Sequence, residues 1–501
     1  MMVRPYLVVC FLCVSLIAID CFFPNSSEAG ALEDDFKYCL ILNGSGSEEG
    51  GEISVDGSGN VIATGSTWSE DFPTRNAYDS THNSLAYTGS PGYADFFVAK
   101  FSSSKQLSWS TYLGGTAQDF CKGVTVDRLG DIVVVGQTKS PDFPALNGYA
   151  TVHLGKEDGV VAKFSSNGSL LWSTFLGGNS TDRVTAAAVD SQDNILVTGF
   201  TASKDFPLLN GTDGTQGFVV KISANGSLLW GRSLNGNCGS SKGDAIAIDE
   251  DDSILITGSC SGDVSVVKLS VDGSILWRKV LGGEDNDWGQ GIGFTSLSNV
   301  IIAGSTESVD FPTIAAIDFT HNGGVDAFAA KLSPNGELIW STFLGGSKDD
   351  NGRAVVVEGD DDILIGGQTK SPDFPAVNET GTQDTDSPDV FVAKVSASGS
   401  LLWNTLLGGN GPEWFSGVAI ENQSNVLIAG STQSFQLSGI VTRLGPPSIG
   451  MQMFLYSTIP IYVPSKATNG GPTAQFLAGI LALAVIVVVR KTNRKPRLVT
   501  T

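Results

Sequence analysis

DGVVAKFSSNGSLLWSTFLGGNSTDRVTAAAVD, residues 158–190, contains in one stretch most of what the rest of the chain repeats. Two apolar runs, 159–164 and 170–175, flank a Ser-Asn-Gly turn, and Leu-Gly-Gly then precedes an acidic Asp182 and a third apolar run. Short runs rich in Val, Ile, Phe and Trp, bounded by turn formers, are typical of β-strands. Because the phrase recurs along the chain, it is one unit of an array.

Seven Leu-Gly-Gly or Leu-Asn-Gly landmarks divide the chain into units. They begin at Leu42, Leu113, Leu176, Leu234, Leu281, Leu344 and Leu407. Each complete unit predicts four strands. The first ends near Val-Asp, the second near Thr-Gly-Ser-Thr and the third near Ala-Lys-Phe, and the fourth carries Leu-Leu-Trp.

The two ends of the array are incomplete in complementary ways. Residues 416–443 supply a first, second and third strand but no fourth, whereas 36–42 supply a fourth strand alone. A closed ring satisfies both exposed edges at once. The chain is therefore predicted to be an all-β, seven-bladed β-propeller with four-stranded blades, whose last blade is closed by the N-terminal strand. An open β-solenoid, the alternative, would need capped ends.

Two phrases identify a family resemblance. GVTVDRLGDIVVVGQTKSPDFP at 123–144 and DGVVAKFSSNGSLLWSTFLGG at 158–178, with their copies over 36–444, resemble the seven-bladed β-propeller repeat family often labelled SBBP. The GSLLW element also resembles the tryptophan-docking motif of pyrroloquinoline-quinone propellers. The first resemblance implies the fold and an exported surface protein, because members of that group are mostly surface or secreted proteins without an assigned chemistry.

Both termini predict export and membrane attachment. Arg4 and the apolar run 7–19 have the pattern of a signal peptide, and the uncharged stretch before Arg490 has the pattern of a stop-transfer helix with a basic cytoplasmic flank. The predicted order is signal peptide (1–29), propeller (30–445), linker (446–471), one C-terminal transmembrane helix (472–489) and basic tail (490–501). This order places the propeller outside the cell membrane on a single span. The alternatives are an uncleaved N-terminal anchor, a buried core helix, and a sorting signal that is cut and replaced by a lipid.

The formal net charge is −22, and it becomes −28 when Arg4 and the five basic residues of the tail are set aside. An acidic exterior of this size disfavours nucleic acid and anionic surfaces and favours cations, basic partners or a salty medium, so no nucleic-acid partner is expected.

An acidic residue stands six positions after the Leu of each landmark except in the fourth unit. These residues are Glu48, Asp119, Asp182, Asp287, Asp350 and Glu413. Each enters the innermost strand, so one interpretation is a Ca²⁺ or cationic ligand at the mouth of the channel. The other is that each side chain caps its own turn by accepting backbone N–H bonds.

The connections between second and third strands, here called the 2–3 loops, vary in length, whereas the other turns are short and uniform. Variable loops on a rigid scaffold commonly carry binding residues. Candidate contacts are the aromatic loop residues Tyr78, Tyr87, Tyr93 and Tyr149.

Four cysteines lie outside the signal region, and two of them flank the first two strands of the fourth unit. Those two, Cys238 and Cys260, predict either a disulfide or a pair of isolated buried thiols. Cys39 and Cys121 have no evident partners.

No catalytic motif is recognised, and the three histidines lie in three different 2–3 loops. The predicted function is a cell-surface scaffold for adhesion or for binding an extracellular glycan or protein, with the 2–3 loops pointing away from the membrane. The alternative is an enzyme, either acting on surface polysaccharide or a quinone-dependent oxidoreductase.

Overall fold

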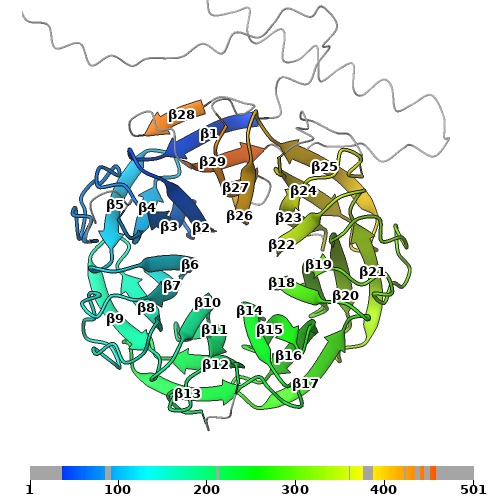
Figure 1. Ribbon diagram of the computed structural model, residues 1–501, viewed down its shortest axis with the longest axis horizontal. Helices are drawn as coiled ribbons and strands as arrows, with labels where there is room; N and C mark the ends of the chain where they lie inside the picture. Colours follow the sequence, from blue (N-terminus) through cyan, green and yellow to red (C-terminus); the bar gives the residue numbers. More distant parts are fainter. Residues whose placement is uncertain are drawn as a thin grey trace, which may run out of the picture.

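The computed structural model describes residues 36–84, 92–209, 214–359, 361–375, 387–421, 425–434, 441–444 and 452–458. Seven β-sheets surround a central channel like the blades of a propeller (Figure 1). Six of them are four-stranded and antiparallel, and their strands follow chain order from the channel outwards. The predicted all-β, seven-bladed propeller with four-stranded blades is confirmed.

Blade 1 consists of β2 (Glu48–Val55), β3 (Val61–Thr67), β4 (Asp95–Phe101) and β5 (Leu107–Leu113). Blade 2 consists of β6 (Asp119–Val126), β7 (Ile132–Thr138), β8 (Asp158–Phe164) and β9 (Leu170–Leu176). Blade 3 consists of β10 (Asp182–Val189), β11 (Ile195–Thr201), β12 (Gln216–Ile222) and β13 (Leu228–Ser233).

Blade 4 consists of β14 (Ser241–Ile248), β15 (Ile254–Cys260), β16 (Asp263–Leu269) and β17 (Ile275–Leu281). Blade 5 consists of β18 (Asp287–Phe294), β19 (Val300–Thr306), β20 (Asp326–Leu332) and β21 (Leu338–Leu344). Blade 6 consists of β22 (Asp350–Val357), β23 (Ile363–Thr369), β24 (Asp389–Val395) and β25 (Leu401–Leu407).

Blade 7 joins the two ends of the chain. Its strands are, from the channel outwards, β26 (Glu413–Glu421), β27 (Asn425–Thr432), β29 (Gln452–Thr458), β1 (Phe36–Leu42) and β28 (Val441–Leu444). The N-terminal strand β1 pairs antiparallel with β29, as predicted for closure of the ring.

The prediction of the third strand in blade 7 was wrong. It is β29, which lies in the segment 446–471 predicted as a linker, and not a strand ending at Arg443. The residues before Arg443 belong to β28, which pairs in parallel outside β1 as a fifth strand. A third strand is covered on both faces, and β29 supplies the buried Met453, Phe454 and Leu455 that such a position needs.

In blades 1–5 an indole on the fourth strand packs on a glycine turn of the next blade. Trp109 Nε1 donates to the carbonyl of Ser166, 3.2 Å away in blade 2, and Trp172 Nε1 donates to that of Ala224, 3.0 Å away in blade 3. The ring also covers the glycine of the same turn. Gly168 has φ +92°, and a Cβ there would lie 2.8 Å from the Trp109 ring, so the turn requires glycine for its conformation and for the close approach.

A buried ion pair inside most blades explains the repeated Val-Asp and Ala-Lys phrases. Asp127, at the end of a first strand, accepts hydrogen bonds from the N–H groups of its own turn and lies 2.7 Å from Lys163 Nζ. Asp56 and Lys100 repeat the arrangement at 2.9 Å. Because the carboxylate is paired and hydrogen-bonded, both charges are tolerated inside the blade.

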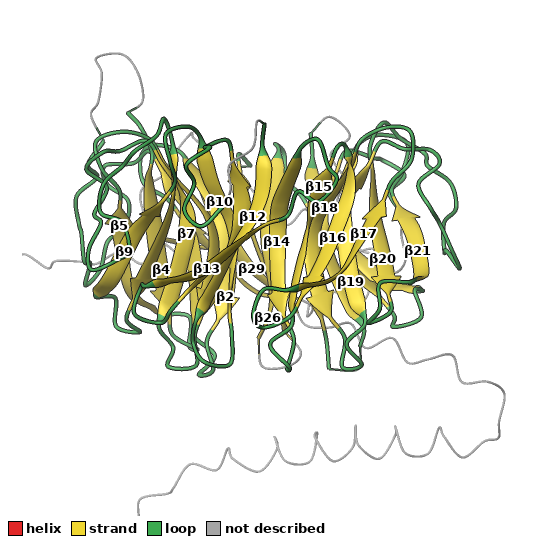
Figure 2. Cartoon of the chain, turned by 90° about the horizontal axis from the view of Figure 1, so that it is seen from below, coloured by secondary structure: helices red, strands yellow, loops and turns green. Residues whose placement is uncertain are grey.

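The 2–3 loops return along the outer side of the blades. In blade 1, Arg75 and Ser110 exchange backbone hydrogen bonds of 3.2 and 2.8 Å, which adds a short pairing outside β5. Leu146 pairs with Ser173 outside β9, and Ile314 pairs with Ser341 outside β21. Figure 2 shows these loops along the sides of the molecule. They protect the exposed edges of the sheets. The prediction treated these loops as binding loops only and did not consider that they cover sheet edges.

The segments predicted for export and anchoring, 1–29 and 472–501, lie outside the described residues. Within the ranges that the structure describes, no helix is long and apolar enough to cross a membrane.

Replacement of Trp172 by alanine is expected to lower the free energy of unfolding by about 3–5 kcal/mol, because the buried indole leaves a cavity between two blades. Trp277→Ala is the matched control. Its indole makes the same type of bond, 2.8 Å to the carbonyl of Pro334, but is only half-buried, so its loss should be less than half as large. Urea denaturation measures both, and equal losses would contradict the proposed role of burial at this contact.

Candidate functional site

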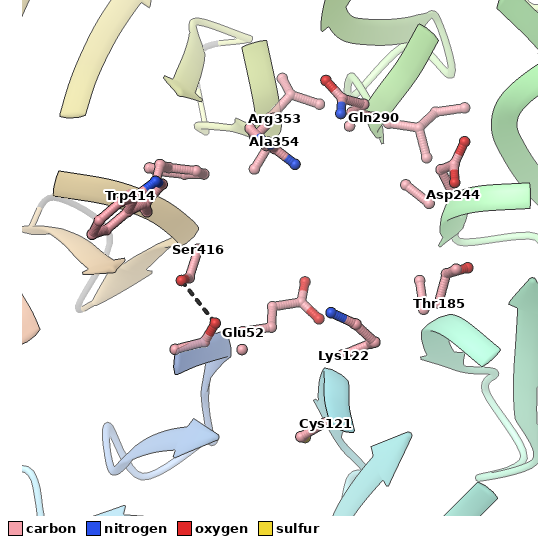
Figure 3. Close-up of a pocket in the computed structure, with 18 of the residues that line it drawn as sticks. Glu52, Cys121, Lys122, Thr185, Asp244, Gln290, Arg353, Ala354, Trp414 and Ser416 are labelled. Atoms are coloured by element: carbon pink, nitrogen blue, oxygen red, sulfur yellow. Dashed lines mark hydrogen bonds between the residues drawn. The ribbon is translucent and has the colours of Figure 1, made fainter. Parts of the chain in front are cut away.

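The centre of the ring holds a cavity of about 550 Å³, lined by first strands from all seven blades. Cavities of 300–1,000 Å³ are typical of small-molecule sites. Figure 3 shows polar side chains from several blades projecting into this space. The cavity is therefore the candidate functional site.

A β-bulge in each first strand shapes the cavity wall. The pairing of first and second strands shifts by one residue at the same place in every blade. The shifts fall at Gly50/Ile53, Cys121/Gly123, Val184/Ala186, Gly243/Ala245, Gly289/Gly291, Gly352/Ala354 and Phe415/Gly417. The extra residue of a bulge is left out of the ladder and its side chain is re-aimed, here towards the channel.

The bulged residues are polar and differ from blade to blade. In blade 1 the bulged residue is Gly51, and Glu52 next to it supplies the side chain. The resulting channel ring is Glu52, Lys122, Thr185, Asp244, Gln290, Arg353 and Ser416. It contains two carboxylates, two cations and three neutral polar groups, so its formal charge is balanced inside a strongly acidic protein.

Several ring members have partners that hold neighbouring blades together. Ser416 Oγ donates to the carbonyl of Gly50 at 2.9 Å, and Thr185 Oγ1 donates to that of Gly243 at 2.7 Å. Glu52 Oε2 accepts from the N–H of Val124 at 3.1 Å. Burial nevertheless raises the pKa of Glu52 to about 7.

Asp244 and Arg353 have no hydrogen-bond or ion-pair partner among the described residues. They lie in blades 4 and 6, with Gln290 of blade 5 between them (Figure 3). Burial raises the pKa of Asp244 to about 6, and burial lowers the pKa of Arg353. The Arg353 side chain is exposed, but only to the central channel. Because the seven blades surround this channel, the guanidinium is less well hydrated than it would be on the outer surface. Within the described part of the chain, neither charged group has a counter-charge to offset its incomplete hydration.

The six predicted acidic residues are not among those that line this cavity. Each is fully buried and bonded within its own blade. In blade 3, Asp182 Oδ2 accepts from the Ser203 hydroxyl at 2.7 Å and from the Gly178 N–H at 2.7 Å. Glu48, Asp119, Asp287, Asp350 and Glu413 repeat the pattern. This geometry supports the turn-capping interpretation rather than a cation at the channel mouth.

A second carboxylate faces this acidic residue across most blade junctions. Between blades 1 and 2, Asp95 and Asp119 both pack against Gly114, and Asp95 Oδ1 has no hydrogen-bond partner among the described residues. Burial raises the pKa of Asp95 to about 8, with the charge of Asp119 adding to the effect, and burial raises the pKa of Asp119 to about 7. At this junction burial, together with the nearby negative charge, favours the protonated form of these carboxyl groups.

The predicted tyrosine contacts are not gathered at the cavity. Tyr78, Tyr93 and Tyr149 are 43%, 37% and 50% exposed and do not line it, and Tyr87 lies outside the described residues. Tyr78 packs edge-on against Phe164 of blade 2. These residues follow the 2–3 loops to the outer rim, because the loops cover the sheet edges.

Blade 4 contains a disulfide between Cys238 and Cys260, whose Cα atoms are 5.3 Å apart. Ser241 occupies the acidic position of this blade, and Cys260 occupies the place of the threonine that ends other second strands. The disulfide therefore replaces the carboxylate contact where the sequence lacks it. Cys39 and Cys121 are free and buried.

Two of the histidines bond the end of a second strand. His82 Nε2 lies 3.0 Å from the Thr67 carbonyl and His321 Nε2 lies 3.2 Å from the Thr306 carbonyl. Their rings pack edge-on against Tyr112 and Phe343. These contacts give both histidines a role in positioning their loops.

Comparison with known proteins agrees with the fold. The family model described as β-propeller repeat (SBBP) matches residues 108–144, which run from β5 to just beyond β7. An uncharacterized WD repeat-containing protein of Acanthamoeba polyphaga mimivirus is 21% identical over 444 residues, which cover 76% of this chain and 29% of that protein. The chain thus spans less than a third of that relative's length.

Several solved structures are similar at low identity. A catalytically inactive virginiamycin B lyase from Staphylococcus aureus, with quinupristin, is 9% identical over 84% of this chain and 99% of that chain, with a TM-score of 0.46. The Pan2 WD40 domain of Neurospora crassa is 9% identical over 86% and 98%, with a TM-score of 0.45. A polysaccharide lyase is 9% identical over 85% and 99%, with a TM-score of 0.44. At these scores the similarities carry no argument about function.

The channel ring was missed by sequence reasoning, although a signal for it is present. Alignment of the first strands shows small or apolar residues on both sides of one position, which reads Lys122, Thr185, Asp244, Gln290, Arg353 and Ser416 in blades 2–7. Residues shared by all repeats hold the repeat together. A position that changes chemistry in every repeat is the better guide to function.

The Asp95–Asp119 pair predicts a pH-dependent stability. Their folded pKa values lie above the unfolded value of 3.8, so the folded protein holds protons that the unfolded chain releases. Their contribution is full below about pH 4, falls as pH rises and is lost above about pH 8. Asp95→Asn should flatten the decline of the urea midpoint between pH 5 and 8, because the amide needs no proton.

The matched control is Asp251→Asn, at an exposed turn, which should leave the decline unchanged. If Asp95→Asn and the parent protein show the same slope, the proton is not held at this pair.

Proposed function

We propose that this protein is a cell-surface binding protein whose channel ring holds a small polar ligand, or the polar end of a larger glycan or protein. One observation carries the proposal. A bulge repeated in all seven blades points a polar side chain of a different residue type from each of blades 2–7 into one cavity.

The unpartnered charges define the ligand's chemistry. Asp244 fits a cationic or hydrogen-bond-donating group, and Arg353 fits a carboxylate, sulfate or phosphate, which its guanidinium can bind with two parallel bonds. Gln290, between them, offers an amide whose Oε1 accepts from the Ser305 hydroxyl at 3.0 Å, leaving the NH₂ group to face the ligand. Trp414 adds an aromatic wall. A ligand with one positive and one negative end fits best.

The surface location rests on the predicted signal peptide, span and basic tail. The described chain ends with β29, whose direction is that of the other third strands, away from the 2–3 loops. A chain that continues from this face to a membrane would leave the 2–3 loops pointing outwards. Calcium binding at the acidic residues of the first strands is tested in the same binding experiments by adding or chelating Ca²⁺.

Isothermal titration calorimetry of the full-length protein with a panel of amino acids, betaines, uronic acids and neutral monosaccharides tests the ligand. We expect a zwitterionic member to bind, and Asp244→Asn and Arg353→Gln each to weaken it at least tenfold by leaving one ligand charge unpaired. Affinity for a ligand ammonium group should fall below about pH 6, where Asp244 becomes protonated.

The matched control for these substitutions is Asp251→Asn, which lies at a turn and should bind normally. Binding that survives both channel substitutions would place the ligand elsewhere on the molecule. A panel without any binding member, with and without Ca²⁺, would contradict the channel as a small-molecule site.

An epitope tag inserted in the 74–94 loop should be stained on intact cells, because this loop is expected to point away from the membrane. A tag in the turn at Gly57, on the opposite face, should be stained more weakly when the protein is anchored. The reverse pattern in an exported protein would show that the proposed orientation is wrong.

A further inference from the structure

The outer edge of blade 4 differs from those of blades 1, 2 and 5, where a 2–3 loop pairs with the fourth strand. Its second and third strands are joined by two residues only, Ser261 and Gly262, so blade 4 has no 2–3 loop to return along β17. No described residue pairs with the outer side of β17. Within the described part of the chain, the edge is thus an unpaired row of backbone donors and acceptors.

The covered edges show what an occupant requires. In blade 2 the loop backbone at Leu146 pairs with Ser173, while the Ser173 hydroxyl donates to the Pro144 carbonyl and Thr174 Oγ1 bonds the backbone of Ala150. Blades 1 and 5 repeat these contacts with Ser110, Thr111, Ser341 and Thr342. A Ser-Thr pair on the fourth strand therefore accompanies a returning loop.

β17 has lost that pair along with the loop. Arg278 and Lys279 stand where the covered strands carry Ser-Thr. Around these cations, Ile275 is 46%, Leu276 55% and Val280 41% exposed. In a chain of net charge −22, this strip combines positive charge, exposed apolar side chains and an open strand edge.

We propose that β17 binds an extended acidic and apolar segment of a partner protein, which adds to blade 4 as a fifth strand. Backbone pairing to an open sheet edge supplies the affinity, and alternate side chains supply the specificity. The molecule already contains such an arrangement, since β28 pairs outside the fourth strand of blade 7.

The charges select the partner. Successive side chains of a strand point to opposite faces, so Lys279 lies on one face of β17 and Leu276 and Val280 lie on the other, together with Arg278. Acidic side chains of the added strand would lie beside Lys279, and its apolar side chains would cover Leu276 and Val280. A second copy of this chain, paired edge to edge through β17, would bring the Arg278 and Lys279 of both copies together, and like charges placed opposite each other are destabilising. The disulfide at Cys238–Cys260 braces the same blade.

The probe is a fluorescent heptapeptide of alternating valine and glutamate, titrated into the full-length protein and followed by anisotropy. We expect saturable binding that weakens at least tenfold with Lys279→Glu and falls with added NaCl. Lys156→Glu, an exposed substitution in the blade 2 loop, should bind the peptide normally. A peptide with lysine in place of glutamate, and one with its central valine replaced by proline, should both bind at least tenfold more weakly.

A second variant tests the edge without relying on one charge. The blade 5 loop, residues 312–325, is inserted between Ser261 and Gly262 together with Arg278→Ser and Lys279→Thr, which should cover β17 and abolish peptide binding. The proposal is overturned if the acidic peptide fails to bind, if the lysine peptide binds equally well, or if Lys279→Glu changes the oligomeric state in light scattering and leaves peptide binding intact.

Discussion

The ring depends on the contact between the indole of one blade and the glycine turn of the next. Trp109 over Gly168 and Trp172 over Gly226 repeat the same fit, in which a Cβ on the glycine would strike the ring. The indole N–H satisfies a carbonyl of the same turn. This contact sets the spacing and angle of neighbouring blades, and closure by β1 then requires the seventh blade to meet the first. The first strands, and the channel ring that they carry, are positioned by this packing of blade against blade.

The repeat divides its residues into two groups with different tasks. Those that recur, such as Asp127 with Lys163 or Asp182 with Ser203, are buried and bonded within their own blade. Those that change, such as Asp244 and Arg353, stand on the bulge and face the channel. The bulge makes this division possible, because it points one unpaired residue inwards while the ladder continues on both sides of it. A rigid scaffold thus presents a ring whose chemistry can vary one residue at a time.

Blade 4 shows how the same repeat tolerates the loss of two of its standard contacts. Without an acidic residue at Ser241, the bond between Cys238 and Cys260 joins the strands. Without a 2–3 loop, β17 is left open and exposes Leu276 beside its two cations. The same reasoning explains why Tyr78 and Tyr149 are exposed and do not line the cavity: the loops that carry them pair with the outer edges of their sheets.

The sequence by itself determined the number of blades, their plan of four antiparallel strands, and closure through residues 36–42, because these follow from local periodicity and from the complementary ends of the array. Only the tertiary structure decided that β29 is the third strand of blade 7, that the loops fold back on β5, β9 and β21, and that the channel ring assembles from the bulges. These outcomes depend on which strand edges remain open and where an extra residue leaves the ladder. Both are set by pairing between segments distant in sequence, which a local pattern does not record.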